Sequence, residues 1–203
     1  PPRETVDATR GEAVESSTRA GARTLLAMGR LSYEKGFDLL LYAFGLAAGA
    51  QPGWHLEVWG EGPLRGELGR LAEGLGLAGR VSFPGFTRRP YEVMRRADLF
   101  AVTSRCEGFS NVLAEAMACG LPVVSFDCPS GPRHVIRDGV DGLLVAPQNV
   151  SALAATLGRL MSDERERARL ASRAPEILER FGTQKVLEEW ERLLAFEGTA
   201  SRR

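Results

Sequence analysis

The feature that most constrains the fold is a repeated alternation of short apolar runs with amphipathic helical segments. In the helical segments apolar residues recur every three or four positions, as in Leu64, Leu68, Leu71 and Leu75, which is the spacing of one helix face. Strands separated by such helices form βαβ units, in which helices cover both faces of a parallel sheet. We therefore expect an α/β fold with a Rossmann-like parallel sheet of about six strands. The predicted strands are residues 24–28, 55–59, 81–83, 99–102, 122–126 and 142–145.

The chain divides into a polar beginning and an ordered domain. Residues 1–22 are dominated by Thr, Glu, Ser, Arg and Gly, so we expect a linker or disordered arm there. The ordered domain is expected over residues 23–182. From Asn149 onward the pattern is helical, with predicted breaks at Pro175 and Gly182.

Composition argues against several classes of function. Lys+Arg and Asp+Glu both number 26, so the formal net charge is zero and no nucleic-acid partner is expected. Cys106, Cys119 and Cys128 are an odd set without a C-x-x-C motif, which argues against a disulfide framework or a zinc site and fits a reducing cytoplasm. No apolar run of about 18 residues is present, and no signal peptide is visible. The missing initiator Met suggests a fragment of a longer chain.

The first candidate site is the glycine-bounded loop of residues 29–36, directly after the first predicted strand. It carries Arg30 and Lys35, five positions apart. A diphosphate needs such charges, because a guanidinium offers planar bidentate donors and an ammonium a mobile point charge. The loop has neither the Walker spacing nor G-x-G-x-x-G, which argues against a P-loop or a dinucleotide site. Two solvated loop cations remain the alternative.

The second candidate site is the start of the helix predicted over residues 111–119. The fourth predicted strand and then Gly108 precede this helix. The first N–H groups of a helix have no partner within it and favour an anion. We therefore expect the N–H groups of Phe109, Ser110 and Asn111 to hold a phosphate.

Glu107 and Glu115 stand at the two ends of this motif, eight positions apart. Asn111 and Glu115 share one helix face, with Glu115 about 6 Å further along the axis. That is a suitable step from a phosphate to a ribose, so a nucleotide sugar would fit. Apolar neighbours surround Glu115, which predicts a buried helix and a carboxylate that needs a partner. The alternative is two surface acids without a special role.

Other reactive residues point less clearly to a function. His55 begins a predicted strand and is expected to be structural, whereas the role of His134, after a Pro-Ser-Gly-Pro turn, is open. Cys106 is expected to be a buried spacer. No nucleophile elbow is present, and the spacing of the two acids does not indicate a hydrolase pair.

Several short motifs follow one another in a fixed order: residues 29–31 with 35–36, 58–63, 81–86, 97–100, the E-x7-E run 107–115, 116–124, 127–132 and 139–147. Together they resemble the C-terminal, donor-binding half of a retaining glycosyltransferase of family 4 (group 1), which has the GT-B architecture. The resemblance covers about residues 23–190, and the order of the motifs makes it highly specific. It implies that residues 183–203 are a C-terminal crossover helix and tail, and that an N-terminal half with the acceptor site is missing.

The resemblance also implies roles for individual residues. Arg30 and Lys35 would bind the donor diphosphate, and Glu107 would bind hydroxyls of the donor sugar; these three are the catalytic residues. Glu115 would hold the ribose diol, and the loop at Phe86 would face the base. Such enzymes use no metal for the diphosphate, so no metal site or cofactor is expected. The implied donor-binding residues are Gly29, Gly60, Phe86, Gly108, Phe109, Ser110, Asn111 and Glu115.

The implied function is transfer of a hexose or N-acetylhexosamine from a nucleoside diphosphate sugar, with UDP favoured, to a glycan or lipid-linked acceptor with retention of configuration. The isolated domain is expected to bind donor weakly and to be inactive. A cytoplasmic location is expected, with peripheral association of the whole enzyme at the inner face of the membrane. Two alternatives stay open: a sugar-nucleotide epimerase or phosphorylase of similar fold, and a non-catalytic nucleotide-binding module. His134 departs from the family pattern, which often has Glu there.

Overall fold

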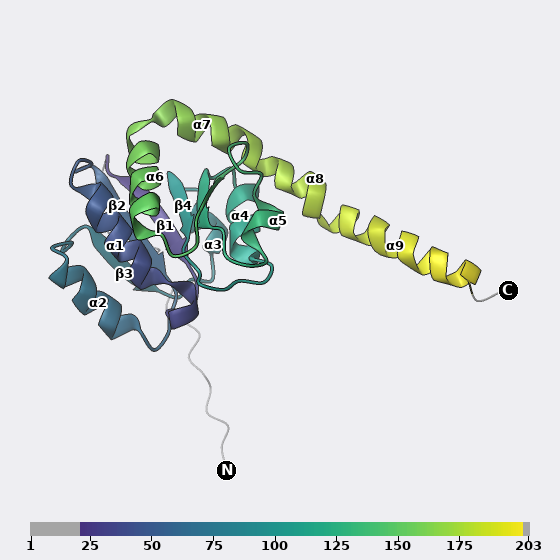
Figure 1. Cartoon of the computed structure of the whole chain (residues 1–203), viewed down its shortest axis with the longest axis horizontal. Helices are drawn as coiled ribbons and strands as arrows, with labels where there is room; N and C mark the ends of the chain where they lie inside the picture. Colours follow the sequence, from purple (N-terminus) through teal and green to yellow (C-terminus); the bar gives the residue numbers. More distant parts are fainter. Residues whose placement is uncertain (1–20, 201–203) are drawn as a thin grey trace, which may run out of the picture.

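The protein folds around one six-stranded sheet, as seen in the computed structural model, which describes residues 21–200 (Figure 1). Every neighbouring pair of strands is parallel, and the order across the sheet is β3-β2-β1-β4-β5-β6. The predicted Rossmann-like α/β fold with six strands is confirmed. The strands are β1 (Arg23–Met28), β2 (Trp54–Trp59), β3 (Val81–Gly85), β4 (Leu99–Val102), β5 (Val123–Phe126) and β6 (Leu143–Val145).

The helices begin and end close to where the apolar spacing places them. Two features were not expected. A short helix, α5, follows β5. Asp163 ends one helix and caps the next by accepting a hydrogen bond from the Glu166 N–H at 2.9 Å. Residues 1–20, which hold most of the predicted arm, and residues 201–203 lie outside the described residues. The helices are α1 (Phe37–Ala48), α2 (Arg65–Gly74), α3 (Pro90–Met94), α4 (Asn111–Ala118), α5 (Pro132–Val135), α6 (Val150–Ser162), α7 (Glu164–Arg173), α8 (Ile177–Phe181) and α9 (Thr183–Ala200), with 3-10 turns η1 (Tyr33–Lys35) and η2 (Ala174–Glu176).

Helices cover both faces of the sheet, and this explains why the strands read as continuous apolar runs. Successive residues of a strand point to opposite faces, so Leu25 packs with α1, α2 and α6, while Leu26 packs with α3 and α4. Both leucines are fully buried. Leu99 and Phe100 of β4 divide between the same two clusters. The central strands therefore have no solvated face and position the loops that follow them rigidly.

The loops that follow β1, β2 and β4 meet at one edge of the sheet. Gly60 packs so closely on Gly29 that a side chain at Gly60 would collide with the Gly29 carbonyl oxygen. Gly36 has a left-handed φ of +62° and lies in the same way against the carbonyl of Thr103, so only glycine fits there. Because the chain winds outward in opposite directions from β1 and β4, this edge is the topological switch point, where ligands bind in open α/β sheets.

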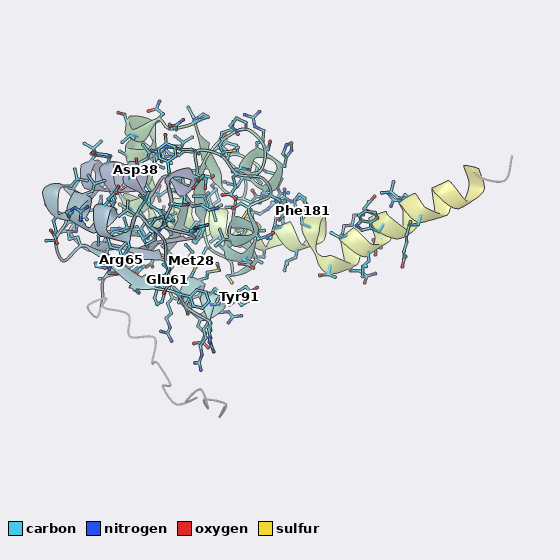
Figure 2. The ribbon with its side chains drawn as sticks, turned by 90° about the horizontal axis from the view of Figure 1, so that it is seen from below. Met28, Asp38, Glu61, Arg65, Tyr91 and Phe181 are labelled. Atoms are coloured by element: carbon cyan, nitrogen blue, oxygen red, sulfur yellow. The ribbon has the colours of Figure 1, made fainter. Side chains whose placement is uncertain are left out.

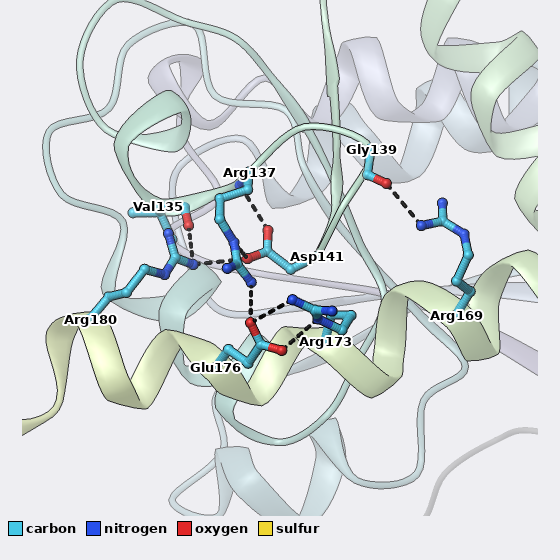
Figure 3. A network of polar contacts seen from close by, with 8 residues as sticks. All are labelled: Val135, Arg137, Gly139, Asp141, Arg169, Arg173, Glu176 and Arg180. Atoms are coloured by element: carbon cyan, nitrogen blue, oxygen red, sulfur yellow. Dashed lines mark hydrogen bonds and ion pairs between the residues drawn. The ribbon is translucent and has the colours of Figure 1, made fainter.

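A polar network attaches the C-terminal helices to the domain (Figure 3). At its centre lies Asp141, whose side chain is fully buried. One carboxylate oxygen accepts from Arg137 Nε at 2.7 Å and from Arg180 of α8 at 3.0 Å, and the other accepts from the Arg137 N–H at 2.7 Å. Arg137 also pairs with Glu176 at 2.7 Å. These contacts link the β5–β6 connection to η2 and α8.

Beyond Gly182, α9 extends away from the rest of the domain (Figure 1). Its apolar side chains recur at helical spacing, yet Leu187, Trp190 and Leu194 are between 51% and 63% exposed. Part of an amphipathic helix face therefore has no partner among the described residues. No helix within residues 21–200 is long and apolar enough to cross a membrane.

His55 makes stability depend on pH. Burial lowers the pKa of its imidazole below the ordinary value of 6.5, so the folded state favours the neutral ring. The unfolded chain therefore binds more protons below about pH 6.5, and stability should fall as the pH drops from there through the lower folded pKa. We expect His55→Gln to flatten this part of the stability curve, measured by urea unfolding between pH 7.5 and 5. A curve parallel to that of the unmodified chain would contradict the assignment.

Candidate functional site

The candidate site lies where the loop of residues 29–36 faces the loop of residues 103–110, at the switch point between β1 and β4. The first loop is fixed by backbone bonds to the β2 loop: the Gly29 N–H donates to the Trp59 carbonyl at 2.9 Å, and the Leu31 N–H donates to the Glu61 carbonyl at 2.8 Å. Arg30 projects from this loop and is exposed. The backbone is thus set by the fold, while the cation remains free to reach a ligand.

Lys35 and Glu107 form an ion pair. The Lys35 ammonium lies 2.7 Å from Glu107 Oε2, and the same oxygen accepts a hydrogen bond from the Ser104 hydroxyl at 2.7 Å. Both charged side chains are mostly shielded, at 26% and 13% exposed. The sequence predicted separate ligands for the two residues, and the structure brings them together. An anion entering the site would compete with Glu107 for Lys35 and release Glu107 to accept from hydroxyl groups.

The start of α4 follows Glu107 after three residues, and Val112 in its first turn lines the neighbouring cavity. Ser110 takes the N-cap position with extended backbone, is 1% exposed, and its hydroxyl has no hydrogen-bond partner among the described residues. A buried polar group without a partner is unusual and fits a place that a ligand completes. Asn111 at the first helical position is exposed. Phe109 points elsewhere: its ring packs on Phe181 of α8 with centroids 5.4 Å apart, so only its backbone could serve a ligand here.

Glu115 lies one helical turn beyond Asn111 on the same face of α4. The sequence predicted a buried setting, but Glu115 is only partly buried, while Leu113, Ala116 and Met117 form the buried face. The Tyr91 hydroxyl donates to Glu115 Oε1 at 3.3 Å. The negative charge of Glu115 raises the pKa of this tyrosine, so the hydroxyl keeps its proton and stays a donor.

A cavity of about 430 Å³ adjoins the loop that carries Arg30. This volume is within the range of small-molecule sites. Phe86, one of the residues that line the cavity, is 66% exposed. Met28 and Glu61 also line it, and their labels lie near each other in Figure 2, with Tyr91 further along the same side. The predicted residues Gly29, Gly60 and Phe86 are therefore brought together. The cavity is lined by Met28, Gly29, Arg30, Trp59, Gly60, Glu61, Phe86, Thr87, Pro90 and Val112.

Sequence reasoning missed the apolar lining of this cavity. Met28 and Trp59 end their strands and Val112 is the second residue of α4, so in the sequence their apolar side chains are indistinguishable from core residues. A usable signal was present, because the last residue of a strand in a parallel sheet lies at the ligand edge. Ser104 was missed for a different reason: its contact with Glu107 depends on the conformation of the loop rather than on a motif.

The remaining reactive residues have no established role in this arrangement. Cys106 is exposed, so the prediction of a buried spacer was wrong. Within residues 21–194, whose side chains the structure describes, no group of three or more His, Cys, Asp or Glu residues could hold a metal ion. That the diphosphate is bound without a metal stays a prediction. His134 is exposed on α5, and its role stays open.

Comparison with known sequences connects this geometry to a family. Residues 11–177 match the family described as "Glycosyl transferases group 1". The chain is 38% identical over 182 residues to an exopolysaccharide phosphotransferase of Streptomyces coelicolor, an alignment that covers 89% of this chain and 19% of that protein. It is 34% identical to the lipopolysaccharide core biosynthesis glycosyltransferase LpsE of Rhizobium meliloti, covering 88% of this chain and 51% of that one. The chain therefore spans about half, or less, of these relatives.

Solved structures agree with the sequence comparison. The structure of HepE from Anabaena in complex with UDP superimposes with a TM-score of 0.81 at 29% identity, covering 87% of this chain and 49% of that chain. The same protein has been solved in complex with UDP-glucose, with a TM-score of 0.79. The fold described here thus corresponds to about half of a protein that binds a nucleotide sugar.

Proposed function

The chain belongs to the glycosyl transferases group 1 family, and on that premise we propose that it is the donor-binding domain of a retaining glycosyltransferase of family 4 with the GT-B architecture. The observation that carries the proposal is the Lys35–Glu107 ion pair shortly before α4, together with a cavity of about 430 Å³ that is lined by both Arg30 and Val112 of α4. Family membership favours sugar transfer over an epimerase, a phosphorylase or a non-catalytic module.

The parts of a nucleotide sugar correspond to parts of this site. The base would enter the cavity beside Phe86, and the ribose diol would donate to Glu115. The diphosphate would lie at the mouth of α4, where backbone N–H groups and the unpartnered hydroxyl of Ser110 could donate to it. Arg30 and Lys35 would stabilise the negative charge that develops on the leaving diphosphate, which is the electrostatic part of catalysis. Glu107, released from Lys35, would orient hydroxyls of the transferred sugar.

The donor we favour is a UDP-hexose or UDP-N-acetylhexosamine. The support is the close structural similarity to HepE, which has been solved with UDP and with UDP-glucose. The acceptor we propose is a glycan or lipid-linked glycan, because relatives are named for exopolysaccharide and lipopolysaccharide biosynthesis. We place the whole enzyme in the cytoplasm, with peripheral association at the inner face of the membrane.

The acceptor site would be supplied by a further domain of the whole enzyme. Two observations support this: the chain spans about half of LpsE and HepE, and the apolar face of α9 around Trp190 has no partner among the described residues. We propose that α9 packs against that domain. The domain alone should bind donor weakly and transfer nothing.

A thermal-shift screen with UDP-, GDP- and ADP-sugars tests the donor assignment. Binding to the folded state raises the melting temperature by mass action. We expect the UDP-sugars to give the largest shift at equal concentration, and the absence of a shift with every nucleotide sugar would overturn the proposal. Retention is tested on the whole enzyme by proton NMR of the product, where an inverted anomeric centre would contradict it.

A further inference from the structure

Arg105, in the loop after β4, makes several contacts with the segment that carries Lys35. Its guanidinium forms a bidentate pair with Asp38 of α1, at 2.9 and 2.6 Å, and donates to the Tyr33 carbonyl at 2.7 Å. It also lies over the Tyr33 ring, 4.0 Å from the centroid. Its backbone N–H donates to the Glu34 carbonyl at 2.8 Å. One residue of the β4 loop thus holds three residues that surround Lys35.

These contacts use three of the five N–H donors of the Arg105 guanidinium, which favours a role in holding the loops over direct binding of a donor. Its side chain is 13% exposed, and both terminal nitrogens are used within the protein. Its Nε is buried and has no partner among the described residues. Asp38 is likewise fixed, because both of its carboxylate oxygens accept from Arg105. A role for this pair in ligand binding would therefore act through neighbouring residues.

The residue through which Arg105 could act is Lys35. The Lys35 backbone is held by the Thr103 hydroxyl, which donates to its carbonyl at 3.1 Å, and its ammonium is held by Glu107 at 2.7 Å. If a diphosphate draws the ammonium away from Glu107, that side-chain contact between the loops is lost. The contacts of Arg105 do not involve the ammonium and remain. They would then keep the Lys35 loop against the β4 loop.

We propose that Arg105, anchored by Asp38, is a positioning residue that holds Lys35 at the donor diphosphate after the Lys35–Glu107 ion pair has opened. A lysine side chain has large rotamer freedom, so its contribution to binding depends on how well its backbone is fixed beforehand. The inference rests on the proposed function, because it requires a diphosphate ligand. Arg105 would thus contribute to specificity for the diphosphate part of the ligand without touching the diphosphate.

The test compares UDP, which has the diphosphate, with uridine, which lacks it. We expect Arg105→Met to weaken UDP binding by about tenfold, the size of one charge-assisted contact, as measured by calorimetry. Uridine binding, followed by NMR titration, should stay within about twofold, because none of the residues that line the cavity is among those that Arg105 contacts. Asp38→Asn should behave in the same direction, and Arg105→Lys should give an intermediate loss because it keeps the charge without the planar fork.

A matched control is Arg80→Met. Arg80 is also a well-bonded arginine over an aromatic ring, donating to the carbonyls of Ala48, Gln51 and Trp54 and lying 5.6 Å from the Phe44 centroid. It directly precedes β3, so it lies at the amino ends of the strands, whereas the site lies at their carboxyl ends. Arg80→Met should lower thermal stability without changing the ratio of UDP to uridine affinity. If Arg105→Met does not fold, Arg105→Lys carries the same comparison.

A double-mutant cycle isolates the route through Lys35. In a Lys35→Met background, Arg105→Met should add less than about twofold to the loss of UDP affinity, because its target is gone. Three results would overturn the inference but leave the proposed function standing. They are equal weakening of UDP and uridine binding by Arg105→Met, unchanged UDP binding in that variant, and full additivity with Lys35→Met. Failure of the unmodified chain to bind either UDP or uridine would overturn the proposed function, and the inference with it.

Discussion

Replacing Asp141 by Asn should destabilise the domain by about 3 kcal/mol, the lower end of what loss of a partner from a buried ion pair costs. The Asp141 carboxylate is fully buried and is the common acceptor for Arg137 and Arg180. An amide in its place would leave two guanidinium groups facing a neutral group. Because these arginines are 36% and 27% exposed, water can hydrate them in part, which is why we expect the lower end.

Urea unfolding measures this effect, as a fall in the midpoint at unchanged slope. The control is Glu164→Gln, which breaks the Arg23–Glu164 pair at 2.7 Å; its side chains are 40% and 73% exposed. Loss of such an exposed pair should cost less than about 1 kcal/mol. Equal effects of Asp141→Asn and Glu164→Gln would show that the network in Figure 3 does not carry the attachment of α8.

The architecture could be predicted from the sequence because each strand is a short apolar run and each long helix has a regular apolar spacing. The predicted strand at 99–102 coincides with β4, and the others agree within two residues at each end. The strand order could not be predicted, since nothing local in β1 says that β4 rather than β6 will lie beside it. The break at Asp163 was missed because residues 162–167 contain no glycine or proline, and only the capping side chain of Asp163 separates α6 from α7.

The candidate site also has a part that could be predicted from the sequence and a part that could not. Residues that follow strands, such as Arg30 and Phe86, could be placed at one edge from topology alone. The pairing of Lys35 with Glu107 could not, because the two are 72 positions apart and meet only when β1 and β4 become neighbours. The role of Asp141 was also missed: it stands in a turn rich in Gly and Asp, where the sequence does not distinguish a solvated acid from a buried one.

Replacing Glu115 by Ala should weaken UDP binding by about 1.5–3 kcal/mol, the range of hydrogen bonds to a charged group. This corresponds to a loss of roughly 10- to 150-fold in affinity, which calorimetry can follow. The fold should be unaffected, because Ala is the best helix former and Glu115 is only partly buried. Its partner Tyr91 is 47% exposed, so the released hydroxyl can bond to water instead. We therefore expect Glu115→Ala to lower UDP affinity and to leave the stability of the fold unchanged.

The ribose assignment can be separated from a general effect of charge. Glu92→Ala removes an acid from α3, next to Tyr91 and paired with Arg89 at 3.6 Å, and should leave UDP affinity within about twofold. The sharper comparison uses 2′-deoxy-UDP, which lacks one of the two hydroxyls that Glu115 would accept from. The unmodified chain should prefer UDP to the deoxy form, and Glu115→Ala should bind the two alike, because the carboxylate that distinguishes them is gone. An undiminished preference for UDP in Glu115→Ala would remove Glu115 from the ribose site and leave the mouth of α4 as a phosphate site only.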